Sequence, residues 1–254
     1  MSGRKIIIAG NWKMHKNSSE TTDFVESLKK KGHDLGASCE VIVAPPFTSL
    51  DAGVRSATGS DISVSAQNVH WEDKGAFTGE ISGAMLTEIG VTHAIIGHSE
   101  RRQFFGETDE TVYKRIKAAI RHKLIPIFCL GETLAERDAG STFDVVRRQL
   151  LAGMGDNIPE NADRFIIAYE PVWAIGTGKT ATPEQAQEVH AFLRNELAQN
   201  RGIDFSNRVR ILYGGSVKPD NTRELMKCPD IDGGLVGGAS LKVDDFLGII
   251  EQAS

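Results

Sequence analysis

The sequence predicts an α/β protein in which eight parallel strands, each followed by a helix, close into a single-domain (β/α)8 barrel. Three observations support this prediction. The chain has 254 residues, a common length for one barrel domain. Short apolar runs recur eight times, and segments with helical periodicity lie between them without a linker. Near-continuous apolar strands also indicate a sheet that is covered on its faces.

The eight apolar runs predict the strands of the barrel. They lie at residues 5–9, 40–44, 61–66, 93–97, 125–130, 165–170, 209–213 and 233–236. Residues 108–122 have the clearest helical periodicity between them. Another helix is expected to begin at Pro183, because Thr182 can cap it and Gln185 completes a capping box. An open doubly wound sheet has the same local pattern and remains an alternative.

Composition narrows the classes of function. Hydrophobic residues make up 40% of the chain and charged residues 25%, as in ordinary globular proteins. The formal net charge is −5, and no run of lysines and arginines is interleaved with aromatic residues, so neither nucleic acid nor a membrane surface is an expected partner. The apolar run near the N-terminus is too short for a signal peptide or a membrane span, which predicts a cytoplasmic protein.

The three cysteines predict neither a disulfide framework nor a zinc site. Cys39, Cys129 and Cys228 are widely spaced, and no histidine pair lies near them. They are expected to be reduced thiols. Cys129 lies inside a predicted strand, where a small buried hydrophobic side chain is expected.

Polar residues follow several predicted strands directly. In a closed barrel these positions gather at one end, so their side chains should meet. The residues are Asn11 and Lys13 after the first strand, His98, Ser99 and Glu100 after the fourth, Glu170 at the end of the sixth, and the glycine-rich turns 214–216 and 237–238 after the last two. A cation, an imidazole and a carboxylate would thus face turns whose backbone N–H groups can bind an oxyanion. This combination predicts a small phosphorylated substrate.

The segment from Glu170 to residue 180 predicts a base beneath a moving cover. Pro171 keeps Glu170 in extended geometry at the exit of its strand. The glycines of residues 176–178 suit a loop that changes conformation. The same loop fails as a P-loop, because Trp173 occupies the position of the first glycine, and it fails as a dinucleotide fingerprint, because no strand runs directly into it.

Five segments resemble signature segments of the triosephosphate isomerase family, in the same order along the chain. They are residues 10–14, 97–102, 168–178, 213–217 and 237–241. The resemblance extends over the whole chain and implies a single TIM-barrel domain over residues 1–254. It implies the reversible isomerisation of dihydroxyacetone phosphate and D-glyceraldehyde 3-phosphate through an enediolate, in glycolysis and gluconeogenesis. The reaction uses neither a metal nor an organic cofactor.

The resemblance also assigns residues to roles. They are the catalytic residues Glu170, His98, Lys13 and Asn11, the substrate- or phosphate-binding residues Asn11, Lys13, Gly176, Ser216, Gly237 and Gly238, and the supporting residues Ser99 and Glu100. Glu170 would be the base and His98 a neutral electrophile, a pairing for which this family is the standard case. A helix that begins at Ser99 is expected to lower the pKa of His98. Residues 172–180 would form the lid that excludes water.

A further implication of the resemblance is a homodimer. The loop at residues 75–80, from Gly75 to Glu80, resembles the loop with which family members reach the neighbouring subunit near Asn11 and Lys13. His15 stands beside this predicted contact, where many relatives carry asparagine.

Two other functions are alternatives to the isomerase. A Schiff-base aldolase would need a lysine within or at the end of a strand, and no apolar run contains an internal lysine. A non-catalytic barrel that only binds a ligand is the second alternative. The presence of Lys13, His98 and Glu170 together argues against it.

Overall fold

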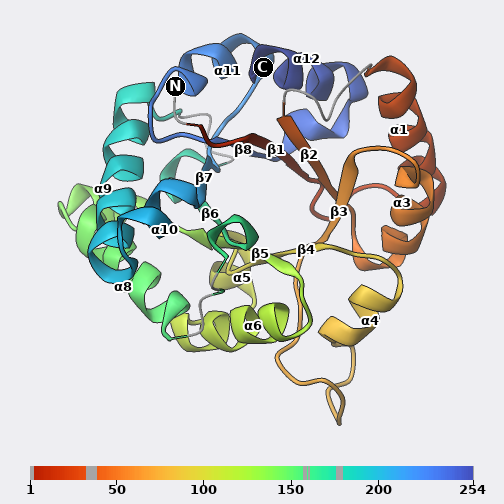
Figure 1. The fold of residues 1–254 in the computed structure, drawn as a ribbon, viewed down its shortest axis with the longest axis horizontal. Helices are drawn as coiled ribbons and strands as arrows, with labels where there is room; N and C mark the ends of the chain where they lie inside the picture. Colours follow the sequence, from red (N-terminus) through yellow and green to blue (C-terminus); the bar gives the residue numbers. More distant parts are fainter. Residues whose placement is uncertain (1–2, 33–38, 157–158, 160, 176–179, 254) are drawn as a thin grey trace.

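The computed structural model describes residues 3–32, 39–156, 159, 161–175 and 180–253. Within them, eight parallel strands form a closed barrel in sequence order (Figure 1). The strands are β1 (Ile6–Asn11), β2 (Cys39–Ala44), β3 (Ile62–Ala66), β4 (His93–Ile96), β5 (Ile125–Leu130), β6 (Ile166–Tyr169), β7 (Arg210–Tyr213) and β8 (Gly233–Val236). Because β1 also pairs with β8, the predicted barrel is confirmed and the open sheet is excluded.

The helices form a ring outside the strands (Figure 1). They are α1 (Ser18–Lys31), α3 (Leu50–Ala57), α4 (Gly83–Glu88), α5 (Ser99–Phe104), α6 (Asp109–Arg121), α7 (Leu134–Asp138), α8 (Thr142–Met154), α9 (Pro183–Arg201), α10 (Ile203–Arg208), α11 (Pro219–Met226) and α12 (Val243–Ala253), with 3-10 turns at Phe47–Ser49, Ala162–Arg164, Val172–Ala174 and Gly238–Leu241. Among the described residues, no helix is long and apolar enough to cross a membrane.

Successive residues of each strand point alternately into the barrel and out toward the helices, and this divides the core into two parts. One cluster consists of strand residues alone and fills the barrel interior: Ile7, Ala9, Ile42, Ala44, Ile95, Ile127, Cys129, Ile166, Ala168, Leu212 and Leu235. Their strand neighbours, such as Ile8 and Val41, pack outward with helical residues such as Phe24 and Leu28. Successive strand residues point to opposite faces, so a continuous apolar run is what a strand covered on both sides requires. Cys129 is fully buried, as predicted.

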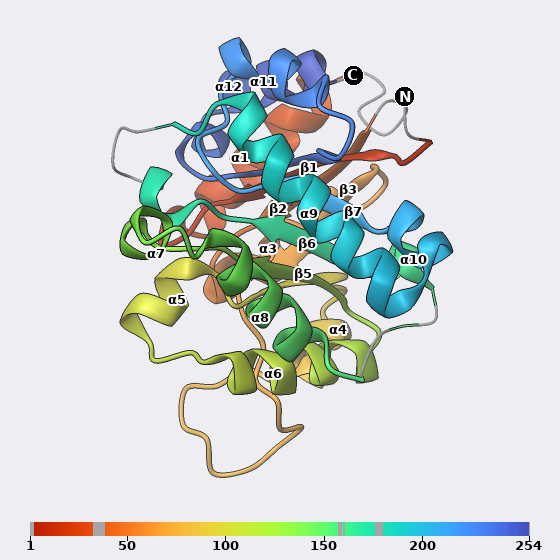
Figure 2. The same ribbon diagram turned by 90° about the vertical axis from the view of Figure 1, so that its left-hand side faces the viewer.

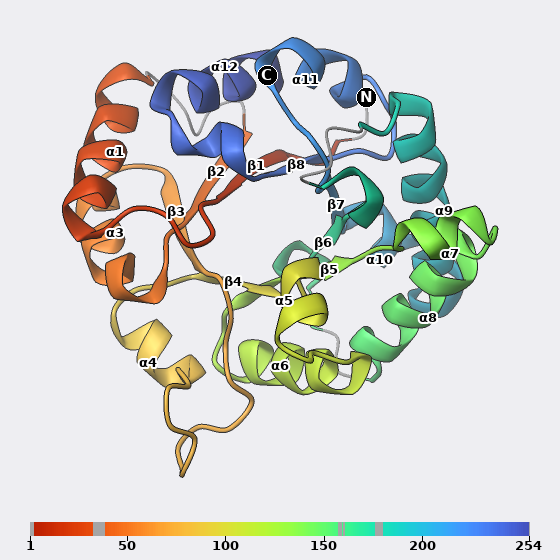
Figure 3. The same ribbon diagram turned by 180° about the vertical axis from the view of Figure 1, so that it is seen from behind.

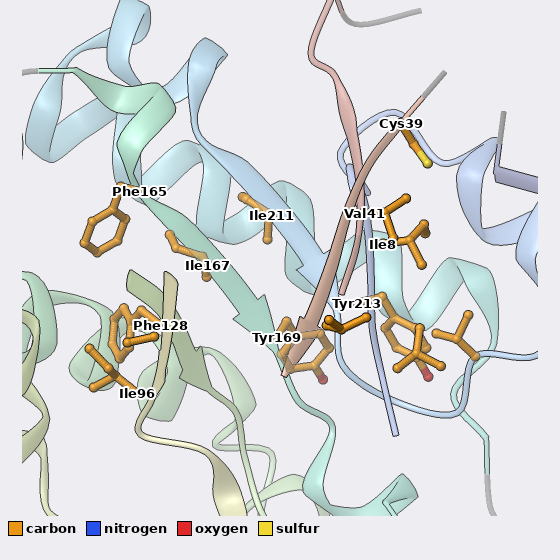
Figure 4. Packing of buried hydrophobic residues seen from close by; sticks show 14 of the residues in the cluster. Ile8, Cys39, Val41, Ile96, Phe128, Phe165, Ile167, Tyr169, Ile211 and Tyr213 are labelled. Carbon is orange, nitrogen blue, oxygen red and sulfur yellow. The ribbon is translucent and has the colours of Figure 1, made fainter. Parts of the chain in front are cut away.

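The outer cluster joins the strands to the surrounding helices. Figure 4 shows part of it, including Ile8, Val41, Phe128, Ile167 and Ile211. Tyr169 and Tyr213 belong to the same cluster and end β6 and β7. Their rings are therefore packed immediately before the loops that follow these strands.

Capping residues close in the sequence determine where α9, the helix after the predicted lid, begins. The Thr182 side chain accepts a hydrogen bond from the Gln185 N–H, the Gln185 side chain accepts one from the Thr182 N–H, and Pro183 is the first helical residue. The predicted capping box is confirmed. At the other end of the lid, β6 stops at Tyr169, one residue before the predicted end, so Glu170 lies just outside the strand.

Different helices lie at the two ends of the barrel. Figure 2 places α5 and α7 at one end and α10 at the other. Figure 3 shows the first end facing the viewer, with α5 beside β4 and β5. The loop between β3 and α4 projects away from the barrel wall in all three views. The carboxyl end that carries α5 is where the predicted site residues should meet.

Candidate active site

A cavity of about 360 Å³ opens at the carboxyl ends of the strands. The predicted site residues that line it are Asn11, Lys13, His98, Glu170, Ser216, Gly237 and Gly238. Asn11 is the last residue of β1, and the others come from the segments after β1, β4, β6, β7 and β8. The barrel therefore brings these side chains and glycine turns into one cavity. Residues 176–179 of the predicted lid, Gly176 among them, lie outside the described residues.

Glu170 is held at the exit of β6 by its backbone and its carboxylate. Its N–H donates to the Leu130 carbonyl at 2.8 Å. Its carboxylate, on a residue only 1% exposed, accepts hydrogen bonds from the Ser99 N–H at 2.9 Å and the Ser99 hydroxyl at 3.3 Å. His98 Nε2 lies 2.9 Å from the same carboxylate. These three donors explain how a charged group is accommodated there.

The electrostatics of Glu170 keep it ionised. Burial alone would raise the pKa of this carboxyl, but the charge of His98 in its protonated form, the hydrogen bond from His98 and the Ser99 N–H together outweigh burial. The pKa of Glu170 is therefore lowered from its ordinary value. A buried carboxylate that is ionised at neutral pH can accept a proton from a substrate.

His98 is oriented by the start of α5. Gly97 has a φ of +76°, which lets the chain turn sharply after β4. His98 then caps α5, and its Nδ1 accepts a hydrogen bond from the Glu100 N–H at 3.2 Å. An Nδ1 that accepts cannot carry a proton, so the proton of the neutral ring is on Nε2. That N–H points toward Glu170 and the cavity.

The predicted direction of the His98 pKa shift is wrong for this structure. Burial would lower this pKa, and so would Lys13, but the charge and hydrogen bond of Glu170, with the charge of Glu100, raise it above its ordinary value. The helix N-terminus alone suggested the opposite direction. The cause of the difference is Glu170, which lies against the imidazole in this arrangement.

Lys13 lines the same cavity as His98 and lies in a constrained loop. Its φ of +52° is in the left-handed region that non-glycine residues seldom adopt. Its backbone N–H donates to Asn11 Oδ1 at 3.1 Å, and its carbonyl accepts from Gln67 Nε2 at 2.8 Å. Its Nζ lies 2.5 Å from Glu100 Oε1. Strained backbone of this kind is typical of functional sites, where surrounding contacts hold it.

The far end of the cavity is formed by the turns after β7 and β8. Gly214, Gly215 and Ser216 line it, as do Gly237 and Gly238. A Cβ added at Gly237 would lie 3.7 Å from Lys13 Cε, and one added at Gly238 would meet no atom within 4 Å. These glycines leave the backbone open to an approaching oxyanion, as at other anion sites built from glycine-rich turns.

Sequence reasoning missed an acid next to the lid. Glu132 follows β5 and is 0% exposed. It accepts hydrogen bonds from the Tyr169 hydroxyl at 3.1 Å, from Trp173 Nε1 at 2.9 Å and from Arg137 Nη1 at 3.2 Å. The signal that could have found it is the one that identified Glu170, namely an acid directly after an apolar strand.

Comparisons with known proteins identify the family of this chain. Residues 6–253 match the sequence profile of the family described as triosephosphate isomerase. A triosephosphate isomerase of Alkaliphilus oremlandii is 54% identical, over 97% of this chain and 99% of its own length. Those of Moorella thermoacetica and Geobacter metallireducens are 56% and 55% identical, each over 97% of this chain and 98% of its own. This chain belongs to the triosephosphate isomerase family.

Proposed function

We propose that this protein catalyses the reversible isomerisation of dihydroxyacetone phosphate and D-glyceraldehyde 3-phosphate, a reaction of glycolysis and gluconeogenesis. The observation that carries the proposal is the convergence of Glu170, His98 and Lys13 on one cavity whose other end is lined by Ser216, Gly237 and Gly238. A carboxylate base, a hydrogen-bond donor and a cation are the groups that proton transfer next to a carbonyl requires.

The first step is removal of a proton from carbon. Glu170 takes a proton from C1 of dihydroxyacetone phosphate, the C–H electron pair becomes the C1–C2 double bond, and the carbonyl pair moves to O2. The Nε2–H of His98 and the amide of Asn11 donate hydrogen bonds to the substrate oxygens, and Lys13 offsets the negative charge. In this structure the Glu170 carboxylate is hydrogen-bonded to Ser99 and lies against His98. It must leave these donors to reach the substrate carbon.

The second step returns the proton to the neighbouring carbon. The O1 proton passes to O2 by way of His98, the C1 carbonyl forms, and the double-bond pair takes the proton back from Glu170 at C2. No atom is gained or lost. The phosphate is held meanwhile by Ser216, Gly237 and Gly238, and by Gly176 of the lid, which excludes water when it closes.

We propose a homodimer for the assembly. The loop at residues 75–80 is tethered to the barrel at its base, where the His70 N–H donates to the Ile81 carbonyl at 2.8 Å and Asp73 Oδ1 lies 2.6 Å from Arg121. The loop carries Phe77, which is 42% exposed and whose ring centroid lies 4.5 Å from that of His70. An aromatic side chain on a projecting, anchored loop is typical of an interface anchor.

Two further expectations remain proposals. We propose that residues 1–254 form one domain, because β1 begins at Ile6 and α12 ends at Ala253 in one closed barrel. We also propose a cytoplasmic location. Its support is chemical, since none of Cys39, Cys129 and Cys228 forms a disulfide, as expected in a reducing compartment.

A coupled assay tests the activity. The purified protein is given dihydroxyacetone phosphate, and glyceraldehyde 3-phosphate is measured by its NAD-dependent oxidation. Glu170→Gln, purified in the same way, controls for a contaminating isomerase. We expect a rate that is lower in Glu170→Gln by about 10²- to 10⁴-fold, the usual contribution of a general base. Equal rates in both samples would contradict the proposal and favour the non-catalytic barrel.

A further inference from the structure

Gln149 makes two hydrogen bonds that no role in the proposed reaction explains. It lies on α8 and is only 6% exposed. Its side-chain oxygen accepts from the Gly131 N–H at 2.8 Å, and its amide nitrogen donates to the Gly131 carbonyl at 3.2 Å. Gly131 lies just beyond the β5–β6 ladder, whose last pair is Leu130 with Tyr169. The side chain of Gln149 therefore satisfies the backbone groups of Gly131 in place of a neighbouring strand.

Gly131 is in turn in direct contact with the backbone of Glu170. A Cβ added at Gly131 would lie 1.7 Å from the Glu170 carbonyl oxygen, so only glycine fits there. Hydrogen bonds join the chains on either side of this contact, from the Glu170 N–H to the Leu130 carbonyl at 2.8 Å and from the Val172 N–H to the Glu132 carbonyl at 3.1 Å. A displacement of Gly131 would therefore displace the backbone of the base.

Gly131 is buried against the Glu170 backbone on one side and borders a cavity on another. A second cavity, of about 780 Å³, is lined by Gly131, Gln149, Ser99 and Glu170 together. Glycine has no side chain to pack, and one of its sides borders this space. The Glu170 backbone limits Gly131 on the packed side, and the amide of Gln149 supplies two hydrogen bonds that reach it from outside the strand.

We propose that Gln149 is a positioning residue for the isomerase reaction: its amide holds Gly131 through both hydrogen bonds, and Gly131 sets the position of Glu170. The inference rests on the proposed function, in which Glu170 moves the proton. A base must lie within a fraction of an ångström of its productive position, and a displacement of about 1 Å can cost about 10²-fold in rate. Substrate binding through the phosphate turns does not involve Gln149.

The test compares two glutamines that make similar contacts. Gln149→Met keeps the length of the side chain and removes both hydrogen bonds. Gln187→Met is the matched control, because Gln187 also donates and accepts, to the Asp230 carboxylate at 2.7 Å and from the Asp230 N–H at 3.1 Å. Asp230 precedes β8, at the end of the barrel away from the cavity. Both variants lose a pair of hydrogen bonds, but only the pair made by Gln149 holds a residue, Gly131, that contacts the base Glu170.

We expect kcat to fall about 10- to 100-fold in Gln149→Met. KM and inhibition by inorganic phosphate should stay within about twofold, since the phosphate turns are untouched. Gln187→Met should keep the wild-type kcat at a similar thermal midpoint. The positioning role is overturned if Gln149→Met keeps the wild-type kcat, or if the two variants lose activity only in proportion to their loss of stability.

A second variant covers the case in which Gln149→Met does not fold. Gln149→Glu keeps the shape and the bond from the Gly131 N–H, but its carboxylate cannot donate to the Gly131 carbonyl. We expect a reduced kcat with unchanged KM. A wild-type kcat in this variant would overturn the proposal that Gln149 holds Gly131 through both hydrogen bonds. Wild-type protein that fails to isomerise the triose phosphate would instead contradict the proposed function. Failure of the proposed function can therefore be distinguished from failure of the positioning role of Gln149.

Discussion

The Nε2 of His98 lies 2.9 Å from the carboxylate of Glu170. These two groups lie just after strands four and six of the barrel, and each changes the acidity of the other. The carboxylate raises the pKa of the imidazole despite burial, and the imidazole lowers the pKa of the carboxyl despite burial. Because a charge stabilises an opposite charge nearby, the effect should disappear when either charge is removed.

The first prediction concerns the pKa of His98. In Glu170→Gln the negative charge is lost, so the protonated imidazole loses its main stabilisation and the pKa of His98 should fall below that of the wild type. Glu100→Gln should lower it less, because Glu170 contributes more than Glu100 to the shift. NMR titration of the ring nitrogens in substrate-free protein measures both. An unchanged His98 pKa in Glu170→Gln would show that the two side chains do not interact in solution.

The second prediction concerns the charge of Lys13. Lys13→Met should lower kcat/KM by about 10- to 100-fold, because a hydrogen bond from a charged group contributes about 1.5–3 kcal/mol. Lys16→Met is the matched control. Lys16 also has a left-handed backbone, with a φ of +72°, but its Nζ lies over the Phe24 ring at 4.8 Å. Steady-state kinetics should show wild-type values for Lys16→Met, and equal losses in both variants would indicate a general effect of the loop.

The third prediction concerns the buried carboxylate of Glu132. Tyr169→Phe removes one of its donors and should lower the free energy of unfolding by about 1–3 kcal/mol, the cost of leaving a buried acceptor underbonded. Tyr113→Phe is the control, because its hydroxyl donates to the exposed carboxylate of Asp156 at 2.8 Å. Water can replace that donor, so the loss should be below about 0.5 kcal/mol. Urea denaturation at one protein concentration measures the free energy of unfolding of both variants. A loss for Tyr169→Phe that is no larger than the loss for Tyr113→Phe would contradict the prediction.

The fourth prediction tests the assembly. Phe77→Asp places a charge on the projecting loop and should convert the dimer to a monomer, halving the mass measured by sedimentation. Ile203→Asp is the control, since Ile203 is 62% exposed on α10 at the opposite end of the barrel. Its mass should not change. A wild-type protein that sediments as a monomer, or a Phe77→Asp variant that stays dimeric, would rule out this loop as the interface.

Most of the fold was predictable because its signals are local. The apolar runs correspond to all eight strands, and the capping box at Thr182 and Gln185 correctly places the start of α9. Residues close in the chain determine these features, through alternation along a strand and capping at a helix end. The positions after the strands were also predictable, because parallel strands end at the same edge of a barrel.

By itself, then, the sequence determined the barrel and the set of residues at its carboxyl end, with family resemblance supplying their roles. Only the tertiary structure decided how these residues meet. Ser99 and Glu170 are 71 positions apart in the chain, and Gly131 and Gln149 are 18 apart. The raised pKa of His98, the burial of Glu132 and the clamp on Gly131 all depend on distances that closure of the barrel sets. Periodicity cannot encode them, because it records which face a residue occupies and not which distant group lies opposite.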